Sequence, residues 1–155
     1  MFSKEIMDFV IKKAENLSSA DVPVIAAISI GDDLISMENN KVEIANCSFY
    51  HAEFLAVQEA LRILNTRYLS NASLYVTLEP CSFCATVLEK VRIKEIFFGA
   101  YDPKCGAVFH NSKIFDHSLF RPNIIGGIQE SRCSKIVERF FKEIRKSKNE
   151  RNKVK

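Results

Sequence analysis

Two short motifs contain the residue types of a metal-dependent hydrolytic site. H-x-E occupies residues 51–53 and P-C-x-x-C occupies residues 80–84, with 26 residues between them. Catalytic zinc takes three protein ligands and keeps a fourth position for water, whose pKa it lowers towards neutrality. An imidazole and two thiolates supply three such ligands, and a nearby carboxylate can move protons without binding the metal. The motifs therefore predict a zinc site formed by His51, Cys81 and Cys84, with Glu53 as the general acid and base.

Both motifs stand at the beginning of a predicted helix. Residues 51–64 have helical periodicity and contain no Gly or Pro, and Pro80 suits the first turn of a helix over residues 81–91. Residues three apart are neighbours on a helix, so both sulfurs of C-x-x-C lie on one face, and the helix N-terminus favours the thiolate. His51 can point at the same place if the two helices pack side by side.

Taken alone, C-x-x-C has other interpretations. It could be a redox pair, but such a pair usually follows a thioredoxin-type βαβ start, which does not precede Cys81. It could also be half of a structural zinc site, which needs a fourth protein ligand. Cys105, His110 or Cys133 could in principle serve as that ligand. The combination of the two motifs, each at a helix start, is more specific than either motif by itself.

Helical and strand patterns alternate along the chain. Strands rich in β-branched and aromatic residues are separated by turn residues and amphipathic segments. This alternation predicts an α/β protein, a three-layer α/β/α sandwich with a central mixed five-stranded sheet, built as a single domain over residues 1–155. The expected helices are 3–17, 51–64, 81–91 and 128–146, the strands are 24–30, 34–37, 74–78, 95–99 and 123–125, and the main loops are 39–49 and 102–106.

The composition is that of a globular cytoplasmic protein. Of 155 residues, 47% are hydrophobic and 26% are charged. The longest apolar run, residues 22–30, is too short to cross a bilayer, and residues 1–9 lack the layout of a secretion signal. Five cysteines, an odd number, do not favour a disulfide framework. We therefore expect a cytoplasmic location and no membrane partner.

The net charge of +3 is concentrated at the C-terminus. Residues 142–155 contain seven basic and two acidic residues, so the rest of the chain is slightly negative. A basic tail on a nearly neutral body is suited to contact with a polyanion. A solvated helix end has the same composition, and charge alone does not choose between these two interpretations.

The two motifs together resemble the zinc-dependent cytidine and deoxycytidylate deaminase superfamily, for which the zinc mechanism described above is already known. Within it, the chain is most similar to the bacterial tRNA-specific adenosine deaminases, and the similarity extends over nearly the whole chain. It depends on the stretch 74–81, on 98–100 with the loop 102–107, on Phe140, Phe141 and Arg145, and on Asn40. Phe54 and Phe83 depart from the family pattern beside the two motifs.

This resemblance implies a cytidine deaminase-like fold, one zinc ion per subunit and a homodimer. It implies hydrolytic deamination of adenosine to inosine at the wobble position of an arginine tRNA anticodon. Asn40 would hydrogen-bond the flipped nucleoside, and Asp102 would border the mouth of the pocket. The backbone of Thr77, Leu78 and Glu79 would wall the pocket. Phe141 and Arg145 would contact the tRNA anticodon stem-loop, although the spacing of Phe141 equally suits a core position.

Two other classes of function remain open. A small-molecule deaminase acting on guanine, cytosine or a free nucleoside or nucleotide would contain the same motifs, but it has less need of a basic tail. A non-enzymatic zinc module, or an inactive partner subunit of an editing deaminase, is the second alternative. An inactive subunit typically loses the acid–base carboxylate, and Glu53 is present.

Overall fold

The helices and strands follow the residue patterns closely, and most of their ends differ from the predicted ends by no more than two residues. The structure is a computed structural model that describes residues 2–153, with the side chains of 2–150. Its elements are α1 (Lys4–Glu15), β1 (Ile25–Ile30), β2 (Asp33–Asn39), α2 (Ala52–Leu64), β3 (Ser73–Leu78), α3 (Ser82–Lys90), β4 (Glu95–Ala100), the 3-10 helix η1 (Ile114–His117), β5 (Asn123–Ile125) and α4 (Glu130–Lys153).

The five strands form one mixed sheet in the order β2-β1-β3-β4-β5. β1 is antiparallel to both β2 and β3, whereas β3, β4 and β5 are parallel to one another. Parallel neighbours finish at the same end of a sheet. The segments that follow β3 and β4, which begin at Glu79 and Tyr101, therefore lie next to each other, and this end of the sheet holds the candidate site.

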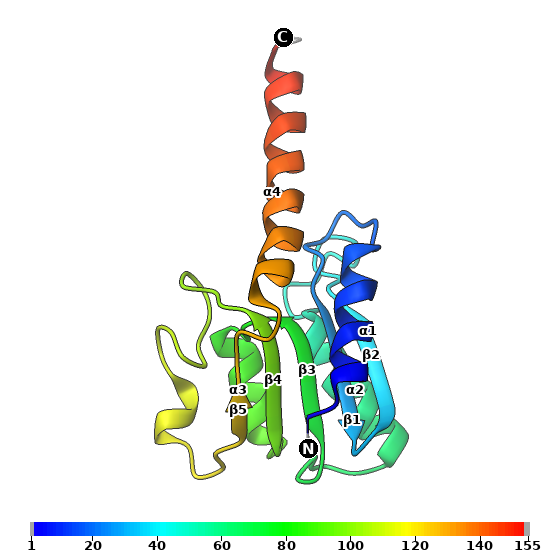
Figure 1. The fold of residues 1–155 in the computed structure, drawn as a ribbon, viewed down its shortest axis with the longest axis vertical. Coiled ribbons are helices and arrows are strands. Elements are labelled where there is room, and N and C mark those ends of the chain that lie inside the picture. The colour runs from blue at the N-terminus through cyan, green and yellow to red at the C-terminus, as the bar shows by residue number, and fades with distance from the viewer. Residues whose placement is uncertain (1, 154–155) are drawn as a thin grey trace.

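Helices cover both faces of the sheet, which confirms the expected α/β/α sandwich (Figure 1). α2 and α3 pack on one face, and α1 and the first half of α4 pack on the other. Alternate residues of each central strand point to opposite faces, so Leu74 and Val76 join the first core while Tyr75 joins the second. Strands buried on both faces need continuous apolar runs, and β1, β3 and β4 have them.

α4 starts later and ends later than expected, and its second half leaves the body of the protein (Figure 1). Its first turns pack tightly on β4 at Gly99, where a Cβ atom would lie 2.2 Å from Cys133 Sγ. Cys133 and Ile136 are buried, whereas Phe141 is 44% exposed. The possible core position of Phe141 is therefore wrong for this chain, because the helix has left the sheet before residue 141.

Two smaller differences depend on tertiary contacts that a single segment does not reveal. β2 covers Asp33–Asn39 rather than 34–37, because it pairs with the whole of β1. η1 was not expected, and it forms where Phe115 is buried in the core beneath α3. Among the described helices, none has both the length and the apolar character that a membrane span requires.

Candidate active site

The three predicted zinc ligands come together where the starts of α2 and α3 meet. His51 is the N-cap residue of α2, Cys81 is the N-cap residue of α3, and Cys84 lies in the first turn of α3. His51 Nδ1 is 3.6 Å from Cys81 Sγ and 3.5 Å from Cys84 Sγ. The ligand atoms all lie within 4.8 Å of one another. One nitrogen and two sulfur donors so arranged fit a catalytic zinc ion with a position left for water.

The close contact of the three groups shifts their pKa values in different directions. The hydrogen bond between the two thiols, together with the contact to His51, lowers the pKa of Cys81 to about 4 despite burial. The same hydrogen bond, reinforced by burial, raises the pKa of Cys84, and the contact with Cys81 raises that of His51. The Cys81 thiolate is thus stabilised by its two protonated neighbours. A zinc ion would displace those protons, as thiolate ligands require.

Glu53 lies in the first turn of α2, directly beside the ligands, and is 6% exposed. Burial is the main cause that raises its pKa to about 7, and the charge of Cys81 adds to the shift. A carboxyl group with a pKa near neutrality can both accept and donate a proton at physiological pH. The position and the protonation of Glu53 are therefore those of a general acid and base.

The carboxylate of Glu79 does not face the ligands but holds the loop that follows β4. Its Oε1 accepts hydrogen bonds from the backbone N–H groups of Val108, Phe109 and His110, at 3.2, 2.8 and 3.2 Å. Its Oε2 accepts from the N–H of Asp102 at 3.0 Å and lies 2.7 Å from His110 Nδ1. Burial opposes ionisation, but these hydrogen bonds outweigh it and lower the pKa of Glu79. The sequence predicts only that the backbone of Glu79 forms part of the pocket wall.

Asp102 lies in the same loop, at the end of the sheet where the ligands are. Its Oδ1 accepts hydrogen bonds from the N–H groups of Lys104 and Cys105, each at 3.1 Å, and so closes the turn that the sequence predicts. The loop then returns to the start of α3, since Gly106 forms a β-bridge with its N-cap residue, Cys81. Asp102 is thus placed near the site through its own loop.

The other expected pocket residues lie at the same end of the sheet. Asn40 follows β2, and the next residue, Lys41, donates its N–H to the carbonyl of Tyr50, just before His51. Thr77 is 1% exposed, and its hydroxyl accepts a hydrogen bond from the N–H of Ile25 at 3.3 Å, so the side chain joins two strands. Leu78, the last residue of β3, is half-buried, whereas the residues before it in this strand are buried.

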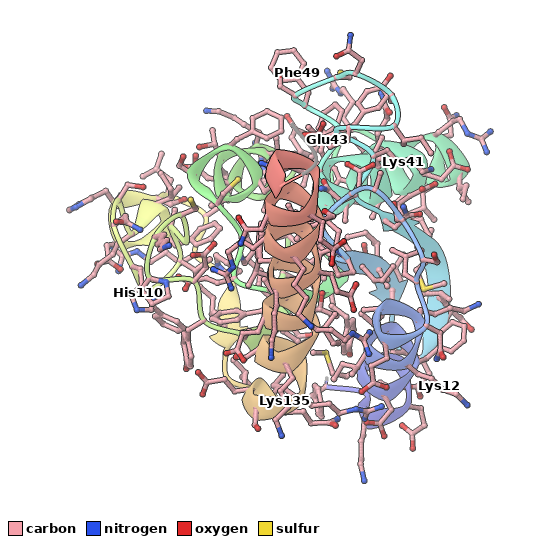
Figure 2. The ribbon with its side chains drawn as sticks, turned by 90° about the horizontal axis from the view of Figure 1, so that it is seen from above. Lys12, Lys41, Glu43, Phe49, His110 and Lys135 are labelled. Atoms are coloured by element: carbon pink, nitrogen blue, oxygen red, sulfur yellow. The ribbon has the colours of Figure 1, made fainter. Side chains whose placement is uncertain are left out.

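Phe141 and Arg145 do not reach the ligand group but lie on the exposed second half of α4. Phe141 packs edge-on against Phe140, with ring centroids 5.5 Å apart. Seen along α4, the loop with Glu43 and Phe49 and the loop with His110 lie on different sides of this helix (Figure 2). The helix therefore projects from the face that these loops border.

Two features near the ligands were not predicted from the sequence. Phe83 lies 5.8 Å from the His51 ring and also contacts Phe49 and Phe54, which gives an aromatic cluster beside the metal ligands. Asp21 is 1% exposed and accepts hydrogen bonds from the N–H groups of residues 43 and 44, which fixes the loop before α2. The departures Phe54 and Phe83 signalled the cluster, whereas nothing local signals the role of Asp21.

A structural zinc site with a fourth protein ligand is not supported. Within the described residues, His51, Cys81 and Cys84 are the only three potential metal ligands that lie together. Cys105 is exposed, and Cys133 is buried between α4, to which it belongs, and β4, where burial raises its pKa to about 11. The Nδ1 of His110 is engaged by Glu79. None of the three candidates therefore joins the ligand group.

Comparison with known proteins gives a consistent result. The family model of the MafB19-like deaminases matches residues 1–146. The tRNA-specific adenosine deaminase of Rickettsia bellii is 40% identical over 140 residues, which are 87% of this chain and 97% of the relative. A solved structure from a study of A-to-I editing by tRNA:A34 deaminases at the wobble position of transfer RNA is 30% identical, with a TM-score of 0.82, and covers 86% of this chain and 99% of its own.

A deaminase of a free base also has a similar fold. The guanine deaminase of Bacillus subtilis is 26% identical, with a TM-score of 0.60, over 65% of this chain and 66% of its own. The likeness is lower in identity, TM-score and coverage than that to the protein from the tRNA:A34 study.

Proposed function

Because this chain belongs to the MafB19-like deaminase family and to the tRNA-specific adenosine deaminases, we propose that it converts adenosine to inosine at the wobble position of a tRNA anticodon. The observation that supports this most is the ligand group of His51, Cys81 and Cys84 beside a buried Glu53. An arginine tRNA is the proposed substrate, and the cytoplasm, where tRNA is found, is the proposed location.

His51, Cys81 and Cys84 would hold one zinc ion, which supplies a water molecule acidic enough to act as a nucleophile near neutral pH. Glu53 would accept one proton from the water that adds to C6 of adenine and donate it to the ring nitrogen N1. It would then carry the second proton of that water to the exocyclic amine, which would leave as ammonia while C6 becomes a carbonyl. The pKa of about 7 suits Glu53 to both directions of transfer.

The target base must leave its stack to reach this carboxyl group. In our proposal Asn40 hydrogen-bonds the flipped nucleoside, and the backbone of Thr77, Leu78 and Glu79 forms a wall of the pocket. Asp102 borders the mouth of the pocket. These assignments are supported by the position of the residues at the ends of β2, β3 and β4, where the two ligand helices begin.

The experiment that tests the function compares polymer and free substrates. Zinc-loaded protein is incubated with an arginine tRNA transcript that has adenosine at the wobble position and, separately, with guanine, cytosine, cytidine and adenosine. Deamination is scored by mass. We expect inosine in the tRNA and no turnover of the free compounds. Turnover of guanine with unchanged tRNA would instead favour the small-molecule alternative, which the likeness to a guanine deaminase keeps open.

The second half of α4 is proposed to bind the anticodon stem-loop through Phe141, Arg145 and its neighbouring basic residues. Replacing Lys142, Arg145, Lys146 and Lys148 by Gln removes four exposed charges from this helix. We expect stem-loop affinity at about 0.1 M salt to fall by about tenfold or more, and the salt dependence of binding to become shallower, since each phosphate contact releases counterions. Fluorescence anisotropy over a salt series measures both.

The matched control is Lys12→Gln, which removes a charge from α1 on the side of α4 away from His110 (Figure 2). It should bind as the unsubstituted protein does. If the α4 variant and this control bind the stem-loop with equal affinity at moderate salt, the basic segment is only a solvated helix end.

We also propose that the protein is a homodimer. The support is the exposed apolar surface beside the ligands, where Ile44 is 73% and Phe49 is 60% exposed and the rings of Phe49, Phe54 and Phe83 cluster. Clustered apolar exposure of this kind often marks an interface. Sedimentation should give twice the 17.6 kDa chain mass, and Phe49→Glu should shift it towards the monomer. A monomeric unsubstituted protein would refute the dimer.

A further inference from the structure

Glu79 is buried more completely than any role at the mouth of a pocket requires. Its side chain is 0% exposed, and both of its carboxylate oxygens are occupied by the five hydrogen bonds to residues 102 and 108–110 described above. A buried carboxylate is tolerated only where such donors replace water. The segment 102–110, which we call the rim loop, can therefore satisfy this charge only in the conformation that brings these donors together.

The rim loop is also attached to the start of α3, at the predicted metal ligand Cys81. The N–H of Ala107 donates to the carbonyl of Pro80 at 2.9 Å, and Gly106 forms a bridge with Cys81. No side chain fits at Gly106, where a Cβ atom would lie 2.4 Å from Glu79 Cδ and 2.5 Å from the Asp102 carbonyl oxygen. The position of the rim loop is therefore tied to that of Cys81, with Glu79 between them.

The outer side of the rim loop is open to a ligand. Phe109 is 44% exposed, and the side chain of His110 is 35% exposed. The Nδ1 of His110 is held by Glu79, and the ring lies edge-on to Tyr101 at 5.9 Å. Within the described part of the chain, Nε2 of His110 has no hydrogen-bond partner. The ring is thus oriented from inside while its second nitrogen remains available.

These observations lead beyond the pocket wall that the family resemblance implies for residue 79. We propose that Glu79 is a positioning residue that holds the rim loop against Cys81 and thereby presents Asp102 and His110 to the RNA strand beside the target adenosine. This inference rests on the proposed function. Single-stranded RNA offers suitable partners, since its unpaired bases stack on aromatic rings, including imidazole, and its phosphates and hydroxyls accept or donate hydrogen bonds.

A positioning role and a purely structural role predict different kinetics. If Glu79 only stabilised the fold, its loss would lower the melting temperature but leave the folded enzyme with normal kinetic constants. If it positions the rim loop, the folded enzyme needs more RNA to reach saturation. The rate at saturation changes less, because the ligands and Glu53 are held by α2 and α3.

The test compares Glu79→Gln, Gly106→Ala and the control Cys105→Ser with the unsubstituted protein, using an anticodon stem-loop under single-turnover conditions. Glu79→Gln removes the charge. Gly106→Ala adds a methyl group on the rim loop that would push this loop away from Glu79. Cys105 lies in the same loop with an exposed side chain, so its serine variant should behave normally. We expect the half-saturating RNA concentration to rise about tenfold in the first two variants, with the saturating rate within about threefold.

Zinc content and amide hydrogen exchange provide readouts besides activity. Both variants should retain one zinc ion per chain, and the amides of residues 102 and 108–110 should exchange faster. Faster exchange with an unchanged half-saturating concentration would overturn the inference. Should Glu79→Gln fail to fold or lose zinc, Gly106→Ala decides by the same criteria. Absence of RNA deamination by the unsubstituted protein would refute the proposed function, whereas normal kinetics in the variants of an active enzyme would refute only this inference.

Discussion

Replacing Glu53 by Gln is expected to reduce deamination of the tRNA by about a thousandfold, the effect of removing a general acid and base. Gln has nearly the same shape as Glu but cannot accept the proton of the attacking water or return it to the leaving amine. Glu53 is buried and has a pKa of about 7, which suits it to accept and to donate a proton. Inosine formation in the wobble-adenosine transcript, followed under single-turnover conditions, measures the loss.

The zinc content separates this catalytic effect from damage to the site. Glu53→Gln should keep one zinc ion per chain and bind the stem-loop normally, because the side chain is not a ligand. The matched control is Glu59→Gln on the same helix, where the carboxylate only pairs with Arg62 on the surface at 2.7 Å. If Glu53→Gln kept more than a tenth of the activity, another residue would have to move the protons.

Replacing Cys84 by Ser is expected to remove both the metal and the activity. Cys84 is fully buried and contributes one of the three ligand atoms, and a hydroxyl is a poor substitute for a thiolate towards zinc. Loss of groups that merely orient zinc ligands costs roughly 10–100-fold in affinity, so loss of a ligand should cost more. Metal analysis after dialysis should find no stoichiometric zinc, and the melting temperature should fall towards that of chelator-treated protein.

The half-buried Cys47 offers a matched control, since it is a free thiol outside the ligand group. Cys47→Ser should keep one zinc ion and full activity. Chelator-treated unsubstituted protein should regain activity on addition of zinc, whereas Cys84→Ser should not. Retention of one tightly bound zinc ion by Cys84→Ser would mean that the metal is held elsewhere and would refute the assigned ligands.

Much of the candidate site is predictable because its parts are local. A C-x-x-C motif at a helix start places two sulfurs on one face wherever the helix lies, and H-x-E at another helix start does the same for an imidazole and a carboxylate. The apolar runs of β1, β3 and β4 predict strands buried on both faces. The ends of elements are less predictable: β2 is lengthened by its pairing with β1, and α4 continues to Lys153.

The gathering of His51, Cys81 and Cys84 and the layered α/β architecture were predictable from the sequence, because each depends on residue types at short spacing. The contacts of Glu79 and the exposure of Phe141 could be seen only in the tertiary structure. Glu79 holds residues 23 to 31 positions further along the chain, which reach it because β3 and β4 are parallel neighbours. Phe141 is exposed because α4 extends beyond the end of the sheet. The reason is the same in both cases: burial and long-range hydrogen bonds depend on which elements meet, and local periodicity does not contain that information.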